Sequence, residues 1–477
     1  MSLLPQFNDK WIATLSAALL VVTSTPLLAA DAKVKDNGFG LVSADGQNSI
    51  NIYGQFHFDS RNISNGLAES NDKDTASGGD QFEIRRARLG VNGTVMKDID
   101  YEFISNTLGS NPNLVHRAYV NYSFNKQAQL RVGRFKQPFS MEEMSSANGI
   151  DFMERSYGDQ LVPSHRLGAM MHGEPFKGFT YGISLYQNGF NENTNTSNVG
   201  NSHAARITLN LAEIQNIKDT ILHVGLSGDQ GRYSTVPTTS SDTGAAAQDK
   251  SRATILSIRS ENRGMANVYR AQLSGDLVTA GYGVSGNNVA NVSSDLKGLE
   301  AVLASNAWKF QAEYIKAGYS AWAVNNTTVG GTPLNANMDL AVDTHYYQVV
   351  YNLTGENWTS AYKSGVFGTI KPKSNFSMGS GGGTGAWQLA LRVSDYKANK
   401  AAQTVQTVGT NTSRTENSFG ARTTTYGVNW ILNPHSRWML NLARTNFDAP
   451  VTYLTTTPSP GTTTKEDVLS LRWQLSL

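Results

Sequence analysis

The chain has 477 residues, a formal net charge of +2, no cysteine and a mean hydropathy of -0.35. These values exclude a helical membrane bundle, thiolate catalysis, cysteine-ligated metal centres and disulfide cross-links. The near-neutral charge gives no global indication of a nucleic-acid partner, so any basic site must be local.

The N-terminus has the pattern of an export signal. An apolar run that ends at Val22 follows a lysine, and small residues stand at Ala30 and Ala32. The run is shorter than the roughly 20 residues of a membrane-spanning helix. The pattern therefore predicts a signal peptide at residues 1–30, with cleavage between 30 and 32.

From residue 49 onward, segments of about ten residues alternate between apolar and polar side chains. The last segment is an example, with Leu471 and Trp473 on one face and Arg472 and Gln474 on the other. The same alternation recurs at 50–59, 116–124, 204–212, 308–314 and 385–396. A period of two residues predicts β-strands with one apolar face.

Short and long breaks between these segments alternate along the chain. The short breaks are 96–100, 124–127, 175–178, 213–218, 305–307, 353–357 and 433–436. The long ones are 61–81, 136–165, 190–201, 231–294, 319–340, 398–419 and 448–464. A soluble sandwich would show turns at regular intervals of 8–12 residues. Short periplasmic turns and long external loops are instead typical of an outer-membrane barrel.

The rhythm predicts an all-β fold, a transmembrane antiparallel β-barrel of about 16 strands. Residues 250–285 alternate in places, so 18 strands remain an alternative. Aromatic residues near the strand ends suit the interfacial girdles of such a barrel: Tyr122, Phe124, Trp308, Trp387, Trp430, Trp438 and Trp473. We expect the Gram-negative outer membrane as location, 31–48 as a short N-terminal periplasmic segment and 49–477 as the barrel.

The segment FEIRRARLGVNG, residues 82–93, introduces arginines into a strand. If Leu89 and Val91 face lipid, Arg86 and Arg88 face a water-filled lumen. Arg85 falls in the lipid phase, so either a bulge redirects it or it lies at the outer rim. The same phase places five more arginines inside, namely Arg117, Arg131, Arg206, Arg392 and Arg472.

Arginine rings select anions in pores. Acidic residues share the lumen, however, including Asp59, Asp100, Glu102, Glu300 and Glu313. For any single arginine the alternative is a mixed lumen that balances its own charge. For the pair Arg86 and Arg88, a binding role is favoured.

The segment VGRFKQPFSMEEMSSANGIDFMERS, residues 132–156, is too apolar for a free external loop. We expect it to fold into the lumen and narrow the pore. This would place Lys136, Ser145, Ser146 or Arg155 at the constriction. The alternative is a loop packed over the rim or into a subunit contact.

These segments, together with DIDYEF, RAYVNY and LTGE followed by GAWQLALRVSDY, resemble the phosphate-selective porins of the O and P family. The resemblance runs from about residue 49 to the end of the chain. It implies trimeric 16-stranded barrels with an arginine ladder and an inward third loop that guide anions. Arg85 and Arg86 match the ladder, and Lys136, Ser145 and Ser146 lie in the constriction-loop segment. The family commonly has Asp where this chain has Arg117.

The expected function is passive diffusion of small anions such as phosphate or polyphosphate, through a homotrimer that contacts outer-membrane lipid and lipopolysaccharide. We expect no cofactor, metal or nucleic acid. A weakly selective diffusion porin is the first alternative. An outer-membrane enzyme or adhesin is another, although the sequence contains no GxSxG, HExxH or Gly-Lys phosphate-binding motif.

Overall fold

The computed structural model describes residues 33–34, 40–64, 67–68, 80–107, 115–188, 200–235, 253–263, 268–273, 290–329, 332–379, 382–399, 401–407, 410–416, 418–454 and 461–477. The expected signal peptide, residues 1–30, lies outside these ranges. In the described part of the chain, no helix combines the length and hydropathy that a membrane crossing requires.

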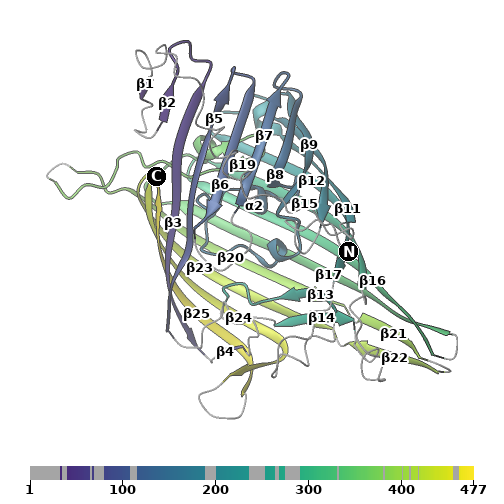
Figure 1. Cartoon of the computed structure of the whole chain (residues 1–477). Helices are drawn as coiled ribbons and strands as arrows, with labels where there is room; N and C mark the ends of the chain where they lie inside the picture. Colours follow the sequence, from purple (N-terminus) through teal and green to yellow (C-terminus); the bar gives the residue numbers. More distant parts are fainter. Residues whose placement is uncertain are drawn as a thin grey trace, which may run out of the picture.

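Sixteen of the described strands form one closed antiparallel barrel (Figure 1). They are β3 (Ser49–Ser64), β5 (Asp80–Val95), β6 (Ile99–Asn106), β7 (Val115–Ser123), β8 (Gln129–Lys136), β9 (His165–Phe176), β10 (Phe179–Asn188), β11 (Gly200–Asn210), β12 (Thr220–Thr235), β15 (Ala290–Ser305), β16 (Trp308–Val329), β17 (Thr332–Asn352), β20 (Ala386–Ala398), β23 (Phe419–Asn433), β24 (Ser436–Leu454) and β25 (Gly461–Ser476). The barrel closes where β25 pairs with β3, with Leu469 opposite Asn62. The predicted number of 16 is confirmed.

Most predicted short breaks are tight connections at one end of the barrel. Five of them are 96–98, 124–128, 177–178, 306–307 and 434–435, and a sixth contains the short helix α3 (Leu211–Ile214). The first barrel strand begins at this end, beside the small strands β1 (Lys33–Val34) and β2 (Gly40–Val42) (Figure 1). Because short turns are periplasmic in such barrels, this end defines the periplasmic side.

The seventh short break is longer than expected. We expected a turn at 353–357, but β20 begins only at Ala386. The intervening segment holds η3 (Trp358–Ala361), β18 (Tyr362–Lys363) and β19 (Val366–Phe367). Trp358 and Phe367 are buried inside the barrel. The chain does turn near Thr354 and Gly355, as the sequence indicates. It then stays in the lumen instead of entering the next strand, because the rings of Trp358 and Phe367 are buried there.

The long break 231–294 contains the hairpin that the alternation indicated. Strands β13 (Ala253–Ile258) and β14 (Tyr269–Leu273) pair only with each other in the described sheets. Their apolar residues, such as Ile258 and Ala271, are buried in a cluster with residues of the barrel wall. The hairpin is therefore packed against the wall rather than inserted into it, and the alternative of 18 strands is wrong.

Further strands extend the barrel at the end opposite the periplasmic turns. Hairpin β21 (Ala401–Thr407) and β22 (Thr410–Glu416) continues the β20–β23 pair, and β4 (Leu67–Ala68) pairs with the end of β24. Strands β16 and β17 reach 22 and 21 residues, whereas β6 and β8 have only 8 each. The barrel wall is consequently much taller on one side (Figure 1).

Residues 137–164, called the inward loop below, fold into the lumen as predicted. They contain α2 (Met141–Met144) and η1 (Tyr157–Gln160). Phe139, Met141 and Phe152 are at most 1% exposed. The backbone N–H of Met153 donates to Asn441 on β24 over 2.8 Å. Burial of the apolar side chains, which was the reason for the prediction, therefore fixes the loop against the wall.

The outward face carries the expected aromatic girdle at the periplasmic ends of the strands. Trp387 stacks on Trp430 with ring centroids 5.1 Å apart, and Trp438 stacks on Trp473 at 5.7 Å. Trp308, at the start of β16, is 48% exposed. Exposed aromatic rings at this height are typical of a membrane–water boundary.

Candidate functional site

A β-bulge in β5 directs two consecutive arginines into the lumen. His57 lies opposite Arg86, whereas Phe58 lies opposite Ile84, so Arg85 is the extra residue. A bulge changes the direction of a side chain in this way. Arg85 Nε then donates to Glu154 of the inward loop over 2.9 Å. Of the two alternatives for Arg85, the bulge is confirmed.

The hydrogen-bond partners of Arg86 and Arg88 are neutral side chains. Arg86 Nη1 donates to His57 Nδ1 at 3.2 Å. Arg88 donates to Asn106 Oδ1 at 2.9 Å and to Gln55 Oε1 at 3.3 Å. No carboxylate of the described residues forms an ion pair with either guanidinium. Because their partners are neutral, both positive charges act on the lumen.

Two further arginines continue this surface on β7 and β8. Arg117 Nη1 pairs with Glu102 Oε2 at 2.8 Å and stays 25% exposed. Arg131 lies over the ring of Tyr119, 4.3 Å from its centroid, which is a cation–π contact. We call the group Arg86, Arg88, Arg117 and Arg131, on β5 to β8, the open wall.

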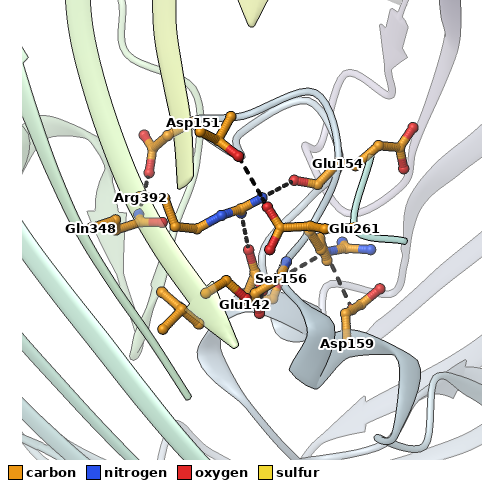
Figure 2. A network of polar contacts seen from close by, with 12 residues as sticks. Glu142, Asp151, Glu154, Ser156, Asp159, Glu261, Gln348 and Arg392 are labelled. Atoms are coloured by element: carbon orange, nitrogen blue, oxygen red, sulfur yellow. Dashed lines mark hydrogen bonds and ion pairs between the residues drawn. The ribbon is translucent and has the colours of Figure 1, made fainter. Parts of the chain in front are cut away.

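The predicted lumenal arginines on other strands are buried in ion pairs. Arg392, which is 1% exposed, donates to Glu142 at 3.0 Å and to Glu261 at 2.6 Å. It also donates to the backbone carbonyl of Glu154 at 2.9 Å, as Figure 2 shows. Its guanidinium lies 4.5 Å from the ring centroid of Phe152. Arg392 therefore anchors both the inward loop and the tip of the β13–β14 hairpin.

Arg472 and Arg206 are bound in the same manner. Arg472 makes two hydrogen bonds to Asp59, of 2.6 and 2.7 Å, and a third to Glu154 at 3.2 Å. Arg206 Nε lies 3.1 and 3.2 Å from the two carboxylate oxygens of Glu300. We call Arg206, Arg392 and Arg472, on β11, β20 and β25, the packed wall.

The inward loop carries part of the negative charge that this pairing uses, and Asp59, Glu261 and Glu300 supply the rest. Its sequence holds five carboxylates and one guanidinium, a sum of −4: Glu142, Glu143, Asp151, Glu154, Asp159 and Arg155. Asp151 pairs with Lys309 of β16 at 2.7 Å, and Glu154 pairs with Arg61, Arg85 and Arg472. The loop thus neutralises cations on the walls that it covers.

The loop residues predicted for the constriction serve mainly to fold the loop. Lys136 Nζ donates to the backbone carbonyls of Glu143 and Ser145, the latter at 2.8 Å. Arg155 donates to the same Ser145 carbonyl at 2.9 Å and pairs with Glu143 at 3.1 Å. Ser145 is buried, whereas Ser146 is exposed. Of this group, Ser146 is the residue with a free surface.

The pKa values of Glu143 and Asp159 shift in opposite directions because the surroundings of the two carboxyl groups differ. Burial raises the pKa of Glu143, but the attraction of Lys136 and Arg155 outweighs burial and brings that pKa to about 2. Burial raises the pKa of Asp159 well above its usual range; Arg155 opposes this and the nearby Glu143 reinforces it. The pKa values of these two neighbouring carboxyl groups are therefore shifted in opposite directions.

Sequence reasoning missed several residues of this network. Arg61 contacts Asp59 at 2.6 Å and Glu154 at 3.0 Å, whereas the polar break 61–81 predicts a loop there. The alternation of β3 continues through Arg61 and would have placed it in the lumen. Lys309 Nζ lies 4.0 and 4.3 Å from the ring centroids of Trp358 and Phe367. No sequence signal indicated that contact, because only a short turn is expected at 353–357.

Within the described ranges, no group of three or more His, Asp or Glu side chains is arranged to hold a metal ion.

Comparisons with known proteins were made for the sequence and for the fold. The family profile described as phosphate-selective porin O and P matches residues 50–476. Similar solved structures include a loop-deletion mutant of OmpT, an outer membrane protein of Vibrio cholerae, with 10% identity, coverage of 90% of this chain and 100% of that chain, and a TM-score of 0.48. An anion-selective porin from Comamonas acidovorans has 11% identity, coverage of 90% and 100%, and a TM-score of 0.46. The outer membrane channel DcaP of Acinetobacter baumannii has 11% identity, coverage of 92% of this chain and 100% of that chain, and a TM-score of 0.45. No curated protein sequence matches the chain.

Proposed function

This chain belongs to the phosphate-selective porin O and P family, and we propose that it conducts small anions, phosphate and polyphosphate among them, by passive diffusion. It is a porin of the Gram-negative outer membrane, and both its family and its barrel indicate a channel rather than an enzyme. The observation that carries the anion preference is the open wall. There, Arg86, Arg88 and Arg131 have no carboxylate partner among the described residues.

The physical basis is the field of these guanidinium groups in a narrow lumen. A unit charge at 4 Å contributes about 1 kcal/mol in bulk water and several-fold more at lower effective dielectric. Since about 1.4 kcal/mol is a factor of ten, a few such groups favour anions by tenfold or more. The planar donor pattern of arginine also matches phosphate. Several shared sites keep each contact weak enough for the anion to leave.

A weakly selective diffusion porin is the second candidate, and the acidic groups favour it. Arg117 is paired with Glu102, and Arg85 with Glu154, so part of the positive charge at the lumen surface is neutralised. The inward loop adds its own carboxylates. The two candidates differ in the size of the field that remains.

Channel recording separates these functions. The purified protein is placed in a planar bilayer between unequal chloride concentrations, and phosphate is then added. We expect the reversal potential to lie near the equilibrium potential of chloride. Added phosphate should reduce the chloride current. A reversal potential near zero without phosphate block would support the weakly selective porin. Absence of steady conductance would support an enzyme or adhesin.

We also propose a homotrimer. The short strands of one side carry exposed apolar residues on their outward faces: Phe103, Val120, Val132, Ile183 and Leu185. Such a face suits contact with another copy or with outer-membrane lipid, lipopolysaccharide included. Mass measurement after mild detergent extraction should give three chains per particle. Finding single chains only would contradict this.

The proposed domain division has its own test. The barrel begins at β3, and we propose that residues 1–30 are removed on export, which leaves 31–48 as a periplasmic segment. N-terminal sequencing of protein isolated from outer membranes should start between residues 31 and 33. A start at Met1 would contradict the division.

A further inference from the structure

The outward face of β11 to β17 changes from apolar to polar at a defined row of residues. Leu226, Leu299 and Tyr314 lie directly opposite one another and are 55, 52 and 41% exposed. In the next outward row, Lys297 lies opposite Lys316. Lys316 is eight residues from Trp308 along β16, which at about 3.4 Å per residue and a strand tilt of about 40° is a height of about 21 Å. This is close to the apolar band of about 25 Å in such barrels.

The lysine pair is therefore at the outer boundary of the membrane. The girdle residue Trp308 marks the periplasmic boundary, because it begins β16 directly after a short turn. Above the lysine row, the same strands have no further apolar band but polar side chains, such as His203, Gln230 and Asp295 in one row. The strands thus continue into the headgroup region of the outer leaflet.

A hollow of about 760 Å³ lies directly above the lysine row on this outward face. Polar side chains line it, including Asn201, His203, Arg232, Asp295, Ser320 and Asp339. Gly318 is part of its lining, and a Cβ there would meet only the backbone oxygen of Asp295 at 3.8 Å. The volume is that of a small-molecule site.

Like charges directly opposite in a sheet destabilise it, so the Lys297–Lys316 pair requires a balancing group. Lys297 Nζ lies 3.5 Å from Asp295 Oδ1, but its side chain is 78% exposed. Lys316 lies opposite Asp343, whose Oδ1 already accepts from the hydroxyl of Tyr314 at 2.7 Å. These acids offset the charges only in part, and both ammonium groups have room for a phosphate at the membrane surface.

We propose that this groove binds the phosphorylated sugar headgroup of an outer-leaflet glycolipid, that is, the lipid A region of lipopolysaccharide. A phosphate lies between Lys297 and Lys316, the sugar occupies the groove over Gly318, and acyl chains descend over Leu226 and Leu299. The carboxylate side chains of the lining accept hydrogen bonds from sugar hydroxyls, and the amide side chains both donate and accept them. This assignment rests on the outer-membrane part of the proposed function and is independent of anion conduction.

A second copy of the chain fits this surface less well. Subunit contacts are depleted in lysine and aspartate at their cores, and those of permanent oligomers are more apolar. The groove instead mixes both charges with amides and hydroxyls, and the two exposed lysines lie in the row of residues directly below its lining. The apolar surface lies below the groove, where acyl chains are.

The test compares glycolipid binding by four proteins. Wild type, the double variant Lys297→Gln with Lys316→Gln, Gly318→Phe and the control Arg444→Gln are purified in detergent. Arg444 is also outward and 61% exposed, but it lies on β24, away from the groove. Binding of a lipopolysaccharide truncated to lipid A and inner core is measured by native mass spectrometry, beside its dephosphorylated form and phosphatidylglycerol. Conductance is recorded for each protein.

We expect a loss of about tenfold or more in affinity in the lysine variant, because two charge-assisted contacts to phosphate are removed. Gly318→Phe should lose binding as well, since the added ring fills the groove without a backbone clash. Arg444→Gln should bind as wild type, and dephosphorylation should weaken binding to both of these proteins.

Several results would overturn the assignment. One is unchanged lipid binding in both groove variants, and another is equal binding of phosphatidylglycerol by wild type. A third is that the groove variants keep the bound lipid but no longer form the oligomer. Conductance and anion preference should stay unchanged in both variants, so failure here is distinguishable from failure of the proposed channel function.

Discussion

The open wall and the packed wall carry the same side chain in two different states. On β5 and β8, Arg86, Arg88 and Arg131 face the lumen with neutral partners. On β20 and β25, Arg392 and Arg472 are at most 1% exposed and bound to two carboxylates each. The difference is whether carboxylates of the inward loop, of the β13–β14 hairpin or of a neighbouring strand reach the guanidinium. An arginine that carboxylates reach becomes part of the scaffold, whereas one that they do not reach keeps neutral partners at the lumen.

The largest expected effect is on stability, from the packed wall. Arg392→Met should lower the free energy of unfolding by about 3–5 kcal/mol, because Glu142 and Glu261 are left buried without their partner. Unfolding in denaturant, followed by loss of the folded band on a semi-native gel, measures this. Arg86→Met on the open wall is the matched variant and should cost far less. Equal losses in the two variants would remove the distinction between the walls.

The next largest effect is on selectivity, from the open wall. The double variant Arg86→Gln with Arg88→Gln should lower the anion-to-cation permeability ratio by about tenfold, since the strand is kept and two charges are lost. The effect should be strongest at low salt, where screening is weakest. Reversal potentials measure the ratio. Arg444→Gln, on the outward face, is the control. If the double variant conducts with its ion preference unchanged, the open wall is structural.

A third change converts part of the covered surface into open surface. Glu154→Gln removes the carboxylate that Arg61, Arg85 and Arg472 share, and it keeps a similar shape. We expect a several-fold higher anion-to-cation permeability ratio, because one negative charge leaves the lumen. The same bilayer recording measures it. A lower ratio would mean that the loop had moved and that its position matters more than its charge.

The smallest expected effect is a pH dependence that arises from Asp159. Its pKa is raised above the ordinary 3.8, so the folded chain holds a proton that the unfolded chain loses. Its contribution to stability is therefore fully present below pH 3.8 and is lost as pH rises through the folded pKa. Ionisation beside Arg155 should also lower the anion preference as pH rises through this range. Asp159→Asn should show neither dependence; a pH profile identical to wild type would contradict this assignment.

The sequence by itself determined the class of fold and a number of about 16 strands, and only the separate β13–β14 hairpin excluded 18. Period-two alternation and the rhythm of breaks specify strand faces, because each residue in a strand points opposite to its neighbour. The same rule placed Arg86, Arg88, Arg117 and Arg392 in the lumen correctly. The apolar composition of residues 132–156 also indicated that Phe139 and Phe152 are buried.

The sequence rule was weaker where the chain leaves regular strand geometry. Arg85 was left open between a bulge and the rim, since a bulge shifts the phase by one residue without a strong composition signal. The segment 353–385 began like a turn, and only contacts such as Lys309 with Trp358 show that it returns into the barrel.

Only the tertiary structure decided which arginines are free. Arg86 and Arg392 have the same phase and the same charge in the sequence, but Glu142 and Glu261 reach Arg392 from loops 250 and 131 residues away. Electrostatic neutralisation depends on distance in space, which strand periodicity does not contain. The periodicity tells which side of the wall a side chain faces. The fold of the inward loop and of the β13–β14 hairpin decides whether that side chain meets a carboxylate.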